Sequence, residues 1–122
     1  MKTRILLMSL LVGFLTLGFN ISANAKDGFT RIETEEDFRK IVVGKTLRFG
    51  ESYFVIKGNG RIKGVFRDKA LRGNWAWREG YWCRTLTTHR KNTECQVWEY
   101  KGKEFFSTRA RGDGKGFTYI AD

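Results

Sequence analysis

From residue 47 onward the chain is divided into short runs of aromatic and β-branched residues, separated by tight glycine-containing turns. Eight runs have the length and composition of strands: 47–49, 53–57, 61–66, 71–77, 81–86, 95–100, 104–109 and 117–120. Connectors such as 58–60 and 112–114 are too short for a crossover, so they join antiparallel neighbours. We therefore expect a mainly β fold, an antiparallel meander of seven to eight strands that forms a small barrel or a strongly bent sheet.

One short helix is predicted ahead of the strands. Thr34 has the character of a capping residue, and the acids at 35–37 would complement the positive end of a helix dipole. Phe38 and Ile41 follow at helical spacing, and Gly44 provides an end signal. We expect one short amphipathic helix that ends at Gly44.

Residues 1–25 have the three-part layout of an export signal. Lys2 and Arg4 precede an apolar run over 5–19, and small residues lead to a cleavage position after Ala25. The apolar run is shorter than the roughly 20 residues that a membrane-spanning helix needs. We therefore expect cleavage, no membrane anchor, and a single β domain of residues 26–122 in the periplasm or outside the cell.

Cys83 and Cys95 are the only cysteines, and in an exported chain they are expected to form a disulfide. A bridge over twelve positions would contribute roughly 3 kcal/mol to stability in the chain-entropy model. If the two residues lie opposite each other, the strands reverse near His89. Alternation then gives them the same sheet face as Val97 and Glu99, with both faces mixed in character. The frequent burial of cystine favours the core face, although alternation leaves the face open.

The basic excess belongs to the predicted mature chain. The export segment holds two of the 23 basic residues and none of the 13 acidic ones, which leaves 21 and 13, a net charge of +8. Such a charge concentrates anions, and an exported protein meets envelope polymers and lipid head groups rather than nucleic acid. We expect a non-enzymatic binding module with Arg61, Lys63, Arg72 and Arg84 as candidate anion contacts. A solubilising surface without any partner is the alternative.

Aromatic residues are dense in the second half of the chain and suggest another function. Trp75, Trp77 and Trp98 are the candidates for an aromatic ligand surface, although core filling explains many such residues. The corresponding alternative is a small barrel carrier, or a protein inhibitor, that uses an aromatic-lined pocket or rim.

No pattern in the sequence indicates catalysis, a metal or a cofactor. His89 is the sole histidine, and it lacks a predicted nucleophile or orienting acid beside it. The glycine-rich segment 58–64 is followed by another strand instead of the helix that a dinucleotide site requires. We therefore expect neither an enzyme nor a bound cofactor, and no metal site.

A tryptophan–cysteine motif resembles a known group of sequences. The motif reads Trp75-x-Trp77-x-x-Gly80-Tyr81-x-Cys83-Arg84, followed by Cys95-Gln96-Val97. It resembles an uncharacterised family of small secreted alphaproteobacterial proteins that has no established activity. The resemblance implies a bacterial envelope setting and a shared disulfide, and it assigns no functional residue.

Overall fold

The computed structural model describes residues 26–122, and the predicted export segment 1–25 lies outside the described residues. The elements in chain order are β1 (Thr30–Arg31), α1 (Glu35–Ile41), β2 (Thr46–Phe49), β3 (Ser52–Ile56), β4 (Arg61–Phe66), β5 (Lys69–Arg78), β6 (Tyr81–Leu86), β7 (Thr93–Lys101), β8 (Glu104–Thr108), the 3₁₀ turn η1 (Ala110–Gly112) and β9 (Gly116–Ala121). All eight predicted strands are present, as β2 to β9. Neither helical element in this part of the chain has the length and apolar character to cross a membrane.

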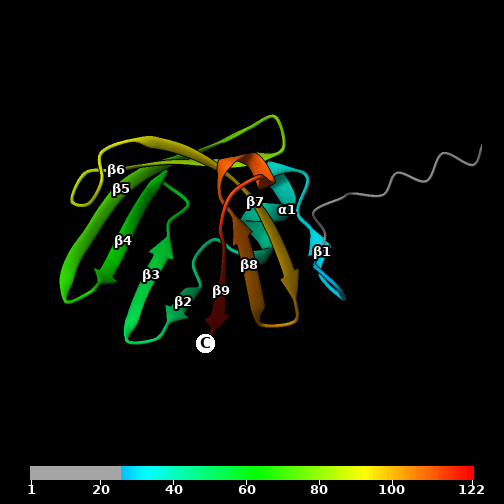
Figure 1. Ribbon diagram of the computed structural model, residues 1–122, viewed down its shortest axis with the longest axis horizontal. Coiled ribbons are helices and arrows are strands. Elements are labelled where there is room, and N and C mark those ends of the chain that lie inside the picture. The colour runs from blue at the N-terminus through cyan, green and yellow to red at the C-terminus, as the bar shows by residue number, and fades with distance from the viewer. Residues whose placement is uncertain (1–25) are drawn as a thin grey trace, which may run out of the picture.

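The strands β2 to β9 form a closed barrel (Figure 1). Each strand pairs antiparallel with the next, and β9 returns to β2 through Leu47 opposite Ala121 and Arg48 opposite Ile120. An ion pair between Arg48 Nε and Asp122 Oδ1, at 2.8 Å, lies beside this closing pair. The sequence left a barrel and a bent sheet open, and the structure is a barrel. The ninth strand, β1, was not predicted and adds to the edge of β7.

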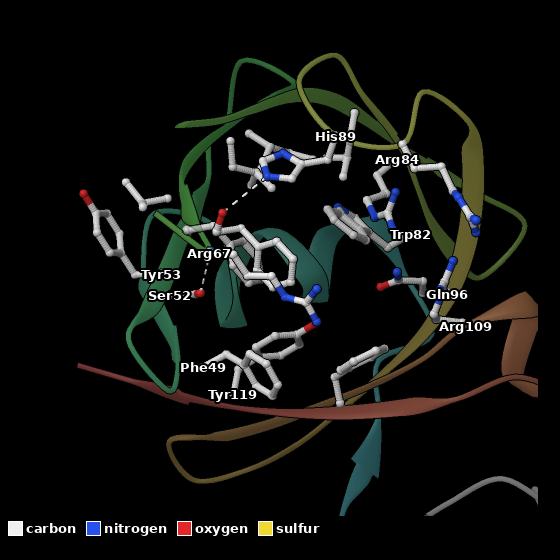
Figure 2. Close-up of a pocket in the computed structure, with 18 of the residues that line it drawn as sticks. Phe49, Ser52, Tyr53, Arg67, Trp82, Arg84, His89, Gln96, Arg109 and Tyr119 are labelled. Atoms are coloured by element: carbon white, nitrogen blue, oxygen red, sulfur yellow. Dashed lines mark hydrogen bonds between the residues drawn. The ribbon is translucent and has the colours of Figure 1, made fainter. Parts of the chain in front are cut away.

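Helix α1 packs into one end of the barrel. Thr34 caps the helix as predicted, because its hydroxyl accepts a hydrogen bond from the Asp37 amide at 3.2 Å. Phe38 is fully buried, with ring centroids 5.1 Å from Trp77 and 5.5 Å from Trp75. Figure 2 looks into the barrel, with α1 behind the side chains that line the interior. The helix therefore closes one end and leaves the other to form a pocket.

The disulfide joins Cys83 to Cys95, which lie directly opposite each other on β6 and β7 as expected. It lies on the outer face of the barrel, the face that alternation had left open, and not on the core face that the frequent burial of cystine favoured. Trp82, the neighbour of Cys83, points into the barrel, so alternation sends the cysteine outward. Cys83 is nevertheless buried, as is Glu99 on the same face, because β1 and η1 lie beside this part of β7.

Candidate ligand-binding pocket

A cavity of about 510 Å³ opens at the end of the barrel away from α1 (Figure 2). Its volume falls within the range of about 300–1,000 Å³ that is typical of small-molecule sites. The apolar part of the lining comprises Phe54, Ile62, Val65, Phe66, Leu71, Trp82, Leu86, Trp98, Phe117 and Tyr119. At the rim, Phe49 and Tyr53 also line the cavity and are among the exposed large hydrophobic residues. The interior can therefore receive an apolar group.

The charged side chains of the lining have one sign. Arg67, Arg84, Arg90, Arg109 and Lys115 line the cavity, and no acidic residue lines it within the described chain. Figure 2 shows Arg84 and Arg109 on one wall, while Arg67 reaches toward the cavity from the other side. Cations around an apolar, low-dielectric cavity attract an anion more strongly than the same cations in open solvent.

Alternate residues of β7 form a hydrogen-bonded chain along one wall. Trp98 Nε1 donates to Gln96 Oε1 at 3.3 Å, and Gln96 Nε2 donates to Glu94 Oε1 at 3.0 Å. Arg109 Nε completes the chain with Glu94 Oε2, at 2.7 Å. Burial acts to raise the pKa of Glu94, but the hydrogen bonds from Arg109 and Gln96 outweigh it and lower that pKa. Glu94 is therefore a carboxylate already engaged within the wall.

Two donors on the neighbouring strand β6 have no partner. Arg84 lies opposite Glu94, yet its Nη1 is buried and makes no hydrogen bond within the described chain. The indole Nε1 of Trp82, two residues earlier on the same inward face, is also buried and unpartnered. Burial lowers the pKa of Arg84, although a guanidinium remains charged. Buried donors are nearly always satisfied in proteins, so these two are exceptions within the described pocket wall.

His89 stabilises the rim of the pocket. Its Nδ1 shares a hydrogen bond with Thr88 Oγ1 at 2.9 Å, and its Nε2 lies 3.4 Å from the Phe66 carbonyl oxygen. The ring also packs edge-on against Phe66. His89 lies in the loop between β6 and β7, and both of its ring nitrogens are held in contacts. Across residues 26–122, no cluster of three histidine, cysteine or acidic residues is arranged to hold a metal.

The structure separates the four predicted anion contacts. Arg61, Lys63 and Arg72 lie on the outer face of β4 and β5, where Lys63 is directly opposite Arg72. Arg84 instead faces the pocket. The reason is the alternation along each strand, since Arg84 shares the inward face of β6 with Trp82.

The three predicted aromatic ligand residues are separated as well. Trp75 and Trp77 pack against Phe38 of the helix, and Trp75 Nε1 donates to the Lys57 carbonyl at 2.8 Å. Trp98 reaches the pocket, where its ring stacks on Tyr119 with centroids 5.6 Å apart. Trp82 was not among the candidates. The sequence signal that could have identified it is its position two residues before Arg84, which puts both side chains on the same face of the strand.

Comparisons of this chain with protein-family models, with curated proteins and with solved structures find no match. The family resemblance of the tryptophan–cysteine motif thus stays a prediction.

Proposed function

We propose that this protein binds a small anionic amphiphile inside the open barrel. The acidic head of the ligand accepts hydrogen bonds from Arg84 and Trp82, and its apolar body lies among the aromatic residues below. The observation that carries the proposal is the pair of buried, unpartnered donors, Trp82 Nε1 and Arg84 Nη1, on one wall of an aromatic-lined cavity. An acceptor on the ligand would satisfy these donors after small movements of the two side chains toward the cavity, and a charged acceptor would make the stronger bonds.

The lining also selects the class of ligand. Four of the five lining cations, all except Arg109, have no carboxylate within 4.0 Å in the described chain, and this favours an anion, while the apolar walls favour a hydrocarbon or aromatic body. The ligand is thus a monocarboxylate or phosphate ester with an apolar part, of the kind that cell envelopes contain. Export of the chain, which the sequence predicts, would bring the pocket into contact with such molecules.

We propose binding without catalysis because the pocket's acid–base groups are committed to fixed contacts. Glu94 accepts hydrogen bonds from Arg109 and Gln96, and both ring nitrogens of His89 are engaged at the rim. The Thr88 hydroxyl beside His89 also accepts a hydrogen bond from the Arg72 amide at 3.0 Å, and no acid is bonded to the His89 ring in the described chain to orient it as a base. Their role is to hold the walls of the cavity.

Matched amphiphiles test the proposal. Tryptophan fluorescence would be followed while the mature protein is titrated with decanoate, decanol or decyltrimethylammonium, because Trp82 and Trp98 line the cavity. We expect decanoate to bind at least tenfold more tightly than decanol, and the cation to bind least. Equal affinity for all three, or no binding of decanoate, would contradict the proposal.

A second candidate function rests on the outer face of β4 and β5. Lys63 and Arg72 are cross-strand neighbours of like charge with Arg61 nearby, and none of the three has an acidic partner within 4.0 Å in the described chain. Like charges placed opposite each other are unfavourable unless an anion binds between them. This face would hold an anionic envelope polymer.

Retention on immobilised dextran sulfate separates the two candidates. The outer-face function predicts that Lys63→Gln with Arg72→Gln lowers the salt concentration needed for elution, while Arg84→Met does not. Unchanged elution of the double variant would contradict it.

A further inference from the structure

Glu99 is a buried acid outside the ligand pocket, and none of the functions above uses it. It lies on the outer face of β7 and is fully buried. No cationic side chain lies within 4.0 Å of its carboxylate among residues 26–122, and its Oε1 has no hydrogen-bond partner there. A buried carboxylate without a countercharge is strongly destabilising, so the position calls for a cation.

Among residues 26–122, the one group bonded to this carboxylate is the backbone nitrogen of Lys26, which donates to Glu99 Oε2 at 3.0 Å. The side chain of Lys26 points elsewhere, since its ammonium lies over the rings of Phe29 and Phe106, 5.0 Å and 4.6 Å from their centroids. A hydrogen bond from the Phe29 amide to the Lys26 carbonyl, at 2.9 Å, closes a turn at this point. Both the side chain and the backbone of Lys26 are thus held in place by contacts with the folded domain.

Arg31 is the other cation that faces Glu99, because the two residues are directly opposite in the β1–β7 pairing. Its guanidinium is directed away, with Nη2 donating to the Gly80 carbonyl at 3.4 Å and the group lying 5.3 Å from the Tyr81 ring. Its Nε is buried without a partner. Arg31 therefore makes no ion pair with the carboxylate within 4.0 Å.

We infer that Glu99 is the binding site for the α-ammonium group that the predicted signal cleavage would create at Lys26. Hydrolysis of the Ala25–Lys26 bond by the signal peptidase leaves a carboxylate on Ala25 and a protonated amine on Lys26. This converts the peptide N–H that touches Glu99 into a charged donor. A peptide nitrogen has one hydrogen to donate and an ammonium has three, so a second can serve Oε1. The ion pair ties the new N-terminus and β1 to the barrel wall that carries the disulfide.

Four proteins test the inference. One chain begins at Lys26 and a second carries the native residues Ala23–Ala25 ahead of it, and each is made with Glu99 and with Glu99→Gln. Both lengths can make the hydrogen bond that the structure contains, and only the shorter one has an ammonium there. Intact mass would verify each N-terminus, and urea unfolding at neutral pH would give the equilibrium constant.

With Glu99, we expect the extension to lower the folding equilibrium constant at least tenfold. With Glu99→Gln, the same extension should change it less than threefold. The difference seen with Glu99 should also fade as the pH rises until the α-amine is deprotonated, because the stabilising charge is then lost. An equal effect of the extension in both backgrounds, or no effect in either, would overturn the inference.

If Glu99→Gln does not fold, chemical labelling of the α-amine in the wild-type mature protein tests the inference instead. The α-amine of the folded mature protein should react with an N-hydroxysuccinimide ester at least tenfold more slowly than the same amine in urea. Equal rates would overturn the inference.

Discussion

Replacing Arg84 with methionine should stabilise the empty barrel and abolish its preference for anions. Methionine replaces the aliphatic part of arginine without a charge or a donor, so it removes the unpartnered Nη1 while keeping the inner part of the wall filled. A residue retained for ligand binding at the expense of stability should behave in this way. A residue retained for structure should show the opposite, with a loss of stability on replacement.

The magnitudes follow from the contacts of Arg84. A buried donor left without a partner costs about 1–3 kcal/mol, and the variant no longer bears this cost. It also loses the attraction to Glu94 on the opposite strand, which offsets part of the gain. We expect a net increase of about 1 kcal/mol in the free energy of unfolding, or roughly 4–8 °C in Tm. A charge-assisted hydrogen bond contributes about 1.5–3 kcal/mol, so decanoate should bind about 10- to 100-fold more weakly.

Urea unfolding and decanoate titration would be measured on the same preparations. Arg61→Met is the matched control, because the same substitution on the outer face should leave both quantities nearly unchanged. A loss of more than about 1 kcal/mol in Arg84→Met would show that the arginine stabilises the fold, against our reasoning. Unchanged decanoate affinity would show that the head group of the ligand lies elsewhere.

Three further predictions concern the scaffold. Phe38→Ala should lower the free energy of unfolding by about 3–5 kcal/mol because the ring is fully buried among tryptophans, whereas Phe49→Ala at the exposed rim should lower it by under about 1 kcal/mol. Comparable losses for the two variants in urea unfolding would contradict the role given to the helix. The pKa of Glu94 is lowered on folding, so its contribution to stability is present above the ordinary glutamate range and is lost as the pH falls through the lowered value. Glu94→Gln should therefore flatten the acid side of a plot of unfolding free energy against pH. An unaltered plot would refute this. A β-carbon on Gly64 would collide with the backbone of β3, so Gly64→Ala should lower the free energy of unfolding by about 3 kcal/mol or more, while Gly58→Ala should be tolerated. Equal melting temperatures for the two variants would contradict this prediction.

The local part of the fold was predictable from the sequence. Alternating apolar residues and short glycine turns identified all eight barrel strands, and Thr34 marked the start of the helix. Closure was not predictable, because it depends on the pairing of Leu47 with Ala121 at opposite ends of the domain. No local pattern specifies a pairing of that sequence separation. The strand β1 was missed because two residues are too few to show a period.

The candidate site was only partly predictable, for a related reason. Alternation correctly put Cys83 and Glu99 on one face and Trp82 and Arg84 on the other, but both faces contain buried groups. The sequence could not show that the N-terminal segment covers the outer face of β7, so the cystine was expected in the core. Likewise, the helix occupies one end of the barrel and takes Trp75 away from the ligand surface. Which end of a barrel stays open is a property of tertiary packing.

The most direct test of the central claim is the NMR signal of the tryptophan indole N–H groups during a decanoate titration. Trp82 Nε1 has no partner in the described structure, whereas Trp75 Nε1 already donates to the Lys57 carbonyl oxygen at 2.8 Å. We predict that the Trp82 signal, assigned through Trp82→Phe, moves furthest and downfield as it gains an acceptor, while the Trp75 signal stays in place. Saturating binding that leaves the Trp82 signal unmoved, or that shifts Trp75 instead, would contradict the proposed site.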